Sequence, residues 1–464
     1  MSGEHRGRGQ GHCPASCKMN KVEKDNQASA SAHSLQLSAL MIVAGEASGD
    51  KHGAALARSI RQLYPETEFE FFGAGGDEMR AAGVETLVDA REVAIIGIPE
   101  IARAFGRLYR AYRRLLSAAR ERRPSAIVLI DWPDFNMRLA RKLHPEGFKI
   151  VYYVSPQVWA WRRYRIRAIR RDVDRMLVIL PFEEEFYKSA GIEVEYVGHP
   201  LAEAVRPSAT RDEFTGRHKL DRSRPIIALL PGSRQKEVHY HLPAMLDAAR
   251  RLRNAECGLR IGSSAKYSFP SNLDHQISNP EHQSSNPHSA FRIPQFIIPL
   301  ATTIARQQVE SIIDEADVRR DIDIAIVERD TYNALEYAEF AIVASGTATV
   351  EAALAGTPMV IIYRGSELNW RLIRPLIHLD TFGMVNLIAG RRVVPELMQK
   401  DVTGERIASE VRAILSNADR LSQMLADLEE VRERLRAGRG AGASKAARAV
   451  IEIARQSSDK AIKQ

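Results

Sequence analysis

Short apolar runs alternate with longer amphipathic segments over most of the chain. Apolar runs bounded by polar or glycine-rich turns are typical of strands buried on both faces of a parallel sheet, and apolar residues three or four apart are typical of helices. The expected strands of a first series are Leu40–Ala44, Phe69–Phe72, Ala126–Ile130, Lys149–Val154, Met176–Leu180 and Val194–Val197. Those of a second series are Ile226–Leu230, Phe296–Ile298, Ile322–Val327, Phe340–Val343 and Met359–Ile362. The pattern predicts an α/β protein with two doubly wound, Rossmann-like domains facing each other across a cleft.

Shifts in composition predict the boundaries of the parts. The expected parts are a disordered extension (1–39), an N-terminal domain (40–203), a C-terminal domain (204–375) and C-terminal helices (376–464). Because Met41 lies at the start of the first expected strand, it is left open whether residues 1–40 are translated. The stretch 262–294 is rich in Ser, Asn, His and Pro and predicts a disordered surface insertion, since it cannot bury enough apolar area to fold alone.

The bulk composition is that of an ordinary globular protein. Of 464 residues, 45% are hydrophobic and 27% are charged, and this length suggests two domains. The chain has no run of about 18 apolar residues and no secretory signal, so we expect a cytoplasmic protein. The 3 cysteines do not suit a disulfide framework. Cys13 and Cys17 lie in a polar tail without the second ligand pair of a structural zinc site.

The net charge of +8 is concentrated in two arginine-rich blocks, Arg103–Arg123 and Arg162–Arg171. A solvated helix face explains either block alone, and nucleic acid is a weaker alternative because the chain has no recognised nucleic-acid-binding module. Basic charge beside apolar and aromatic residues favours attraction to anionic lipid or to a phosphorylated substrate. We therefore expect the helix 95–123 to contact an anionic membrane surface, and no nucleic acid to be bound.

Two turns between an apolar run and a helix-like segment carry the strongest chemical signal. Leu230–Arg234 and Ala344–Thr347 place small residues where a helix begins, so unpaired N–H groups and the helix dipole would point at one anion. Arg234 would add a planar fork for phosphate oxygens, and Glu351, one turn beyond Thr347, would accept from a ribose hydroxyl. Neither turn has the spacing of a Walker or a dinucleotide-binding loop, which favours a sugar-nucleotide diphosphate.

The first expected strand ends in the turn Gly45–Asp50. One interpretation makes this a plain strand–helix turn in which Asp50 caps the following helix. In the other, its glycines let the backbone approach a ligand, and Glu46, Ser48 and Gly49 belong to a substrate site. The two interpretations are compatible.

Asp131 is the candidate general base. It follows the strand Ala126–Ile130 directly, so it is expected at the carboxyl edge of the sheet, where this fold class binds ligands. The pairs Asp172–Asp174 and Asp321–Asp323 have the Asp-x-Asp spelling of metal-dependent glycosyltransferases but do not follow a strand. They are interpreted as solvated charges, so no metal and no cofactor is expected. Arginine and helix ends would neutralise the leaving group instead.

The segment Tyr153–Trp161 carries two tryptophans beside a Ser-Pro turn. Packing in the core or in a lid is the simpler interpretation. Stacking on a sugar ring or an acyl chain is the functional one.

Taken together, these motifs resemble the lipid-A-disaccharide synthase family, which are inverting glycosyltransferases with the two-Rossmann (GT-B) fold. The resemblance covers about residues 41–400 with the motifs in family order, and only the N-terminal tail and the stretch 262–294 depart from it. The matching segments are Val43–Asp50, Ile96–Glu100, Ile130–Asn136, Tyr153–Trp161, Leu230–Arg234, Ala344–Glu351 and Asn386–Arg391.

The resemblance implies a reaction and its partners. UDP-2,3-diacylglucosamine would donate its sugar to the 6-hydroxyl of 2,3-diacylglucosamine 1-phosphate (lipid X), giving UDP and the β-1′,6-linked lipid A disaccharide 1-phosphate. Such an enzyme would be cytoplasmic and peripherally associated with the inner membrane; a homodimer is left open. In this family the C-terminal helices usually cross back onto the first domain.

The resemblance also assigns residues. Asp131 matches the family aspartate proposed as base, acting directly or through water. The implied UDP-sugar site comprises Gly232, Ser233, Arg234, Ser345, Gly346, Thr347, Glu351 and Asn386. The implied acceptor site comprises Glu46, Ser48, Gly49, Ser155, Gln157 and Trp159.

Other functions fit parts of the pattern. A cell-wall N-acetylglucosaminyltransferase or a UDP-sugar 2-epimerase would also use two domains and a sugar nucleotide. A dehydrogenase is disfavoured by the missing G-x-G-x-x-G. A basic nucleic-acid- or membrane-binding protein would form no product.

Overall fold

The computed structural model describes residues 39–90, 101–160, 163–253, 293–367, 370–371, 374, 381–436 and 442–462. The expected N-terminal extension up to residue 38, the segment 95–100 and nearly all of the expected insertion 262–294 lie outside the described residues. The chain divides into two compact units. The first comprises Met1–Pro156, Ala168–Met176 and Ala443–Gln464, and the second comprises Gln157–Arg167 and Leu177–Gly442.

The first sheet has seven strands in the order β3-β2-β1-β4-β5-β6-β7, and the pairs from β3 to β5 are parallel. Its strands are β1 (Ala39–Ala44), β2 (Glu70–Gly75), β3 (Glu85–Asp89), β4 (Ala126–Ile130), β5 (Ile150–Tyr153), β6 (Arg175–Val178) and β7 (Val194–Tyr196). Every residue of β1 and β4 is buried, which explains why both appear in the sequence as unbroken apolar runs. The strand order reverses direction between β1 and β4, so a ligand is expected beyond the carboxyl ends of these two strands.

Helices connect these strands. They are α2 (Ala47–Leu63), α3 (Asp77–Ala81), α5 (Ile101–Arg122), α6 (Pro133–Leu143), α7 (Ile166–Asp172) and α8 (Pro181–Ser189), with short 3₁₀ turns at His144–Glu146 and Arg163–Arg165. Two further short helices, α9 (Leu201–Ala204) and α10 (Arg211–Arg217), lead into the second sheet.

The second sheet has six parallel strands in the order β10-β9-β8-β11-β12-β13. They are β8 (Ile226–Leu230), β9 (Gln295–Leu300), β10 (Ile324–Glu328), β11 (Phe340–Ala344), β12 (Met359–Tyr363) and β13 (Glu396–Met398). Here the order reverses between β8 and β11, the two strands that precede the predicted phosphate turns. The topology therefore brings both turns to one place.

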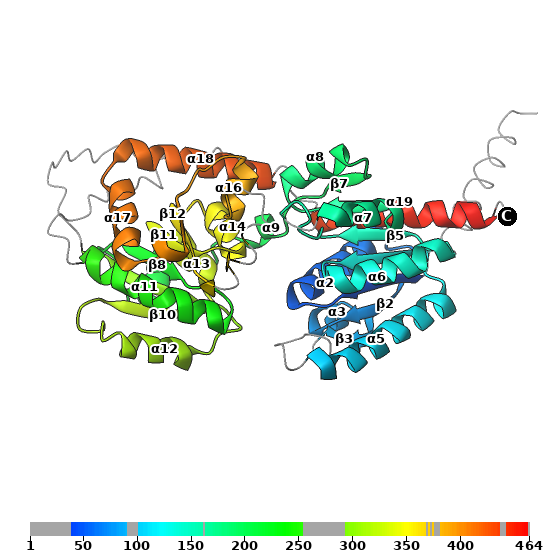
Figure 1. Cartoon of the computed structure of the whole chain (residues 1–464), viewed down its shortest axis with the longest axis horizontal. Helices are drawn as coiled ribbons and strands as arrows, with labels where there is room; N and C mark the ends of the chain where they lie inside the picture. Colours follow the sequence, from blue (N-terminus) through cyan, green and yellow to red (C-terminus); the bar gives the residue numbers. More distant parts are fainter. Residues whose placement is uncertain are drawn as a thin grey trace, which may run out of the picture. The chain divides into compact units, whose positions relative to one another are not determined.

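Helices cover both faces of the second sheet (Figure 1). One group is α11 (Gln235–Arg253), α12 (Arg306–Glu315) and α17 (Gly404–Leu415). The other is α13 (Thr331–Tyr337), α14 (Thr347–Leu354), α16 (Met384–Ala389) and α18 (Ala418–Arg436). A 3₁₀ turn spans Gln399–Asp401. No helix in the described ranges is both long and apolar enough to cross a membrane.

The last helix, α19 (Gly442–Ile462), belongs to the first unit although it follows the second along the chain. The Arg175 guanidinium pairs with Glu452 at 2.7 Å, and Arg455 lies over the ring of Tyr64 at 5.5 Å. Its apolar face, including Val450 and Ile453, is buried.

The expected fold class is confirmed: both sheets are doubly wound and each expected strand is present within a few residues. Two strands were not expected, β3 and β13. Each lies at the edge of its sheet, where a short strand needs no continuous apolar run.

Candidate functional site

A pocket of ≈ 910 Å³ opens at the carboxyl ends of β8, β9, β10 and β11 in the second unit. The sequence-predicted residues that line it are Gln157, Gly232, Ser233, Arg234, Ser345, Gly346, Thr347 and Glu351. Residues that sequence reasoning did not single out include Arg206, Ser208, Glu237, Thr302, Arg329, Asp330, Tyr332 and Asn333. The two predicted phosphate turns and the predicted ribose carboxylate thus share one cavity large enough for a small-molecule ligand.

The turn between β11 and α14 has the geometry expected of an anion site. Gly346 is the N-cap of α14 with extended φ of 161°, and no atom lies within 4 Å of where its side chain would begin. Gly346 and Thr347 are exposed on the pocket wall. The first N–H groups of a helix have no acceptor within the helix, so this turn offers donors and a positive dipole end to the pocket.

The turn between β8 and α11 differs from the expectation. Its N–H groups were expected to be unpaired, but those of Ser233 and Arg234 donate to Oε2 of Glu237 at 3.0 and 3.2 Å. Nη1 of Arg234 donates to Oε1 of the same carboxylate at 2.9 Å. The Glu237 carboxylate therefore occupies the place predicted for a phosphate. Glu237 is the third residue of α11, a position from which a carboxylate can accept from N–H groups at the helix start. The residue three positions before it is Arg234 rather than Ser or Thr, so the sequence carries no capping-box signal for this contact.

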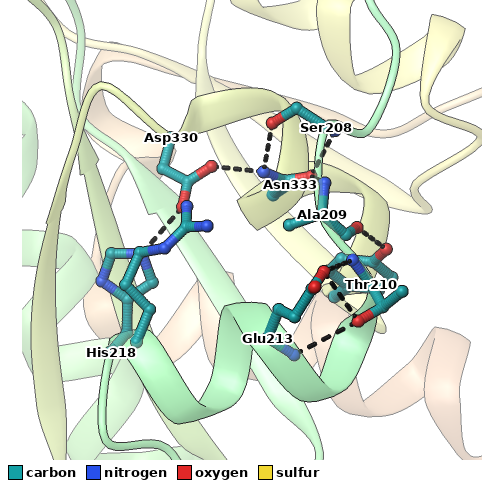
Figure 2. A network of polar contacts seen from close by, with 9 residues as sticks. Ser208, Ala209, Thr210, Glu213, His218, Asp330 and Asn333 are labelled. Atoms are coloured by element: carbon teal, nitrogen blue, oxygen red, sulfur yellow. Dashed lines mark hydrogen bonds and ion pairs between the residues drawn. The ribbon is translucent and has the colours of Figure 1, made fainter.

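One wall of the pocket is built on a buried polar network (Figure 2). Asp330, only 7% exposed, accepts from Arg217 at 2.8 Å and from His218 at 2.9 Å, and also from Asn333. The Asn333 carbonyl accepts from the N–H groups of Ser208 and Ala209 at 2.9 and 3.2 Å. Burial raises the pKa of Asp330, but its hydrogen bonds and the Arg217 charge outweigh burial and lower it below the usual value.

Glu351 and Tyr332 lie close together on this pocket. Glu351 is half-buried on α14, one turn after Thr347, as the ribose interpretation requires. Burial and then the Glu351 charge raise the pKa of the Tyr332 hydroxyl, so this hydroxyl stays protonated and can donate.

In the first unit, Asp131 lies where it was predicted, directly after β4. It is half-buried, and burial followed by the nearby Glu46 carboxylate raises its pKa to about 6. Its φ is 47°, that of Trp132 is 48°, and Val154, after the neighbouring strand β5, has φ of 63°. Left-handed backbone is costly for residues with side chains and concentrates at functional sites. The carboxyl ends of β4 and β5 therefore form a strained, perturbed carboxylate site.

Two side chains hold this strained turn in place. The Asn136 amide donates to the main-chain oxygens of Asp131 and Ile130 at 2.8 and 3.2 Å. The Tyr152 hydroxyl donates to the same Asp131 oxygen at 2.6 Å. Asn136 is fully buried, and its Oδ1 has no hydrogen-bond partner among the described residues. The buried amide is thus committed to the backbone of the candidate base.

The glycines of the turn after β1 were expected to let the backbone approach a ligand, but they lie against other residues of the protein. A side chain at Gly45 would begin 2.2 Å from the Trp132 ring, which itself stacks on Phe135 at 3.9 Å. Gly49 is buried, and a side chain there would meet Ala44 at 3.2 Å. These glycines therefore admit neighbouring protein groups, while Glu46 and Ser48 are exposed.

Asp50 does not cap its own helix. It lies inside α2, and its carboxylate accepts from the N–H groups of Gly76, Glu78 and Met79 at 2.7, 3.0 and 3.1 Å. The expectation of a local cap was wrong because the side chain reaches the start of α3 instead.

The Tyr153–Trp161 motif is divided in the structure. Ser155 is buried, and Gln157 is exposed on the pocket of the second unit. Trp159 is 5% exposed, its indole donates to Glu183 at 3.0 Å, and its ring meets Phe182 edge-on at 4.9 Å. The structure places Trp159 in the core of its unit rather than on an open surface. Trp161 lies outside the described residues.

Asn386 is fully buried and does not line the pocket. Its amide donates to Val394 and Glu396, and its carbonyl accepts from the N–H groups of Val393 and Val394. These contacts use its polar atoms to hold the segment after α16.

The Asp-x-Asp pairs were expected to be solvated charges, but Asp172 is buried at 1% exposure, and three of the four carboxylates pair with basic side chains. Asp172 pairs with Arg171, Asp174 with Lys149, and Asp323 with Arg224. No group of three or more metal-binding side chains occurs in the part of the chain that the structure describes.

Comparison with known proteins decides the family. A family model described as lipid-A-disaccharide synthetase matches residues 40–293 and 271–450. A lipid-A-disaccharide synthase from Koribacter versatilis is 41% identical over 419 residues, which cover 90% of this chain and 99% of the relative. The chain belongs to the lipid-A-disaccharide synthase family. The resemblance inferred from the motifs is confirmed.

Solved structures extend the fold beyond the lipid-A-disaccharide synthase family. A putative UDP-N-acetylglucosamine 2-epimerase from Listeria monocytogenes matches with TM-score 0.53 and 12% identity over 83% of this chain and 90% of that chain. The calicheamicin glycosyltransferase CalG4 matches with TM-score 0.51 and 11% identity over 90% of this chain and 98% of that chain. At such identities the likeness shows the fold alone, which is the expected GT-B fold with its two parallel sheets.

Proposed function

We propose that this chain transfers 2,3-diacylglucosamine from UDP-2,3-diacylglucosamine to the 6-hydroxyl of 2,3-diacylglucosamine 1-phosphate, releasing UDP. Membership of the lipid-A-disaccharide synthase family carries the proposal. The pocket of the second unit supports it, because a helix start, an arginine and a carboxylate line one cavity. These groups suit a diphosphate and a ribose, which together make up much of a nucleotide donor.

In this proposal the second unit binds the donor. The start of α14 and Arg234 hold the diphosphate, and Glu351 accepts from a ribose hydroxyl. Fixed donors of this kind stabilise the negative charge that develops on a leaving phosphate.

The first unit supplies the base. The acceptor's 6-hydroxyl oxygen attacks the anomeric carbon opposite the diphosphate, forming a new C–O bond as the bond to the phosphate oxygen breaks. UDP leaves with that electron pair, and the hydroxyl proton passes to the Asp131 carboxylate. A pKa of about 6 leaves this carboxylate ionised at neutral pH and basic enough to take a proton.

The membrane surface is the proposed source of both substrates, since each carries acyl chains. On α5, Arg107, Arg110 and Arg113 are exposed, and Tyr109 is 53% exposed. Arg120 and Arg122, in contrast, are paired with Glu146 and Glu85. The first half of α5 thus offers charge and an aromatic ring to anionic headgroups of the inner membrane.

The direct test uses the two purified lipid precursors and mass spectrometry. Wild-type protein is expected to form a tetraacyl disaccharide 1-phosphate and equimolar UDP, and Asp131→Asn is expected to lose at least 100-fold in rate, in the range of about 10²–10⁴ for a lost general base. Turnover of UDP-N-acetylglucosamine alone, with no disaccharide, would instead indicate an epimerase.

A further inference from the structure

The Pro231–Arg234 turn is held by two residues that lie one turn apart on α11. Glu237 accepts from the N–H groups of Ser233 and Arg234 and from the Arg234 guanidinium. Gly232 has φ of 123°, and a side chain there would begin 2.6 Å from Oε2 of Glu237. The backbone therefore closes around this carboxylate as anion-binding turns close around a phosphate.

His241 holds the other side of the turn. Its Nδ1 lies 2.8 Å from the Pro231 carbonyl oxygen, and its Nε2 accepts from the Arg364 N–H at 2.9 Å. A carbonyl needs a donor and an N–H needs an acceptor, so the ring is the neutral tautomer with its proton on Nδ1. Burial lowers the pKa of His241, which favours this neutral form. The turn is thus anchored independently of Glu237.

The two turns of the pocket are therefore not equivalent. At the start of α14, Gly346 and Thr347 are exposed on the pocket wall. At the start of α11, in contrast, the protein's own carboxylate accepts from the N–H groups of Ser233 and Arg234. The Glu237 side chain is 24% exposed and that of Arg234 is 81% exposed. The carboxylate is the fixed partner of this pair, and the arginine is the one that solvent and ligand can reach.

We infer that Glu237 is a positioning residue for the donor's diphosphate. Its carboxylate occupies the N–H groups of Ser233 and Arg234, so they are not available to a phosphate, and it binds Nη1 of Arg234. A guanidinium carries donors on three nitrogens, so Nε and Nη2 remain for phosphate oxygens. The diphosphate is then bound by Arg234 and the start of α14, not by the backbone of both turns. This inference rests on the proposed function.

The alternative is that Glu237 leaves when the donor binds. A phosphate on the Ser233 and Arg234 N–H groups would have to displace three contacts of Glu237 and bring a second negative charge beside it. Like charges at hydrogen-bonding distance repel strongly in a partly buried site. In that case removing the Glu237 charge would tighten donor binding, which is the opposite of our expectation.

The test is UDP binding by calorimetry to the full chain, comparing wild type with Glu237→Gln. Glutamine retains an oxygen for the two N–H groups but loses the charge that holds Arg234. We expect the Kd for UDP to rise roughly tenfold, as for loss of a charge-assisted contact. The Kd for UMP, which lacks the second phosphate, should change less. In turnover, KM for the donor should rise while kcat and KM for the acceptor change little.

Asp247→Asn is the matched control, because Asp247 lies on the same helix and pairs with Arg250 and Arg251 at 3.0 and 2.9 Å. It should leave UDP binding unchanged. The second variant is Arg234→Gln, alone and combined with Glu237→Gln. If Glu237 acts through Arg234, the double variant binds UDP no more weakly than Arg234→Gln.

Unchanged or tighter UDP binding in Glu237→Gln would overturn the inference. So would losses of UDP affinity that add up in the double variant with Arg234→Gln. Wild-type protein that does not bind UDP at all would contradict the proposed function instead.

Discussion

The side-chain amide of Asn136 donates to the main-chain oxygen of Asp131 at 2.8 Å, across a turn in which both Asp131 and Trp132 have left-handed backbone. The Tyr152 hydroxyl reaches the same oxygen at 2.6 Å. Asn136 and Tyr152 thus position the candidate base through its main-chain oxygen. Neither of these two contacts uses the Asp131 carboxylate.

Tyr152→Phe removes one of these two anchors without removing a ring. We expect kcat to fall by about 3–30-fold, since a positioning hydrogen bond of about 1 kcal/mol is lost and the carboxylate is less well placed. KM for the donor should not change, and steady-state kinetics at saturating donor measures both. Tyr112→Phe is the control, because that hydroxyl also donates to a main-chain oxygen, but to that of Arg138 at 3.3 Å and not to that of Asp131. Equal effects of the two variants would contradict the positioning role.

The pH dependence of the reaction should follow Asp131. A base must be ionised to accept a proton, so kcat/KM is expected to rise with pH up to about 6 and to level off above it. Glu46→Gln removes the neighbouring charge and should move this limb to lower pH. The movement should be partial, because burial is the larger cause of the shift and remains.

The matched control for this profile is Glu121→Gln, which removes an exposed carboxylate on α5. It should leave the limb in place. If the apparent pKa of the kcat/KM profile is the same in Glu46→Gln as in wild type, the measured pKa belongs to a group other than Asp131.

Gly45→Ala should damage the first unit. A side chain at Gly45 would begin 2.2 Å from the Trp132 ring, so the ring and its left-handed turn must move. Overpacking of this kind costs about 1–3 kcal/mol of unfolding free energy, and the displaced turn should also lower kcat. Urea unfolding measures the first effect. Gly216→Ala on α10, where no atom lies within 4 Å, is expected to be neutral or stabilising. A Gly45→Ala variant as stable and active as wild type would refute this packing argument.

Membrane binding should depend on the exposed arginines of α5. Changing Arg107 and Arg110 to Glu is expected to weaken binding to anionic liposomes at low salt several-fold or more, since each basic residue near such a surface contributes about 1 kcal/mol. Co-sedimentation measures the bound fraction. Arg222→Glu with Arg319→Glu makes the same charge change at exposed sites of the second unit. Binding that is unchanged, or lost equally in both pairs, would remove α5 as the contact.

The buried strands could be predicted from sequence because β1, β4, β8 and β11 are apolar on both faces. Their turns could be predicted with them, since small residues between a buried strand and a helix start have few other uses. What could not be predicted was the partner of each polar side chain. The Asp50 carboxylate accepts from the start of α3 rather than from its own helix. The Glu237 carboxylate accepts from N–H groups of the β8–α11 turn that were expected to be unpaired.

The partners of Trp159 and Asn386 could not be predicted from the sequence either. Both lie in motifs of the family, and both are polar or aromatic residues of the kind that binds substrates. The structure gives each an internal partner, Glu183 and the segment 393–396. A sequence shows which residues occur together in a motif, but not which of them face a ligand and which support it.

The position of α19 in the first unit has a consequence for protein synthesis. This helix leaves the ribosome only after the entire second unit has been synthesised. Until then, Arg175 and Tyr64 of the first unit lack their contacts with Glu452 and Arg455. A fragment ending before residue 442 would lack these contacts permanently. The two units therefore cannot be separated by a single cut in the gene.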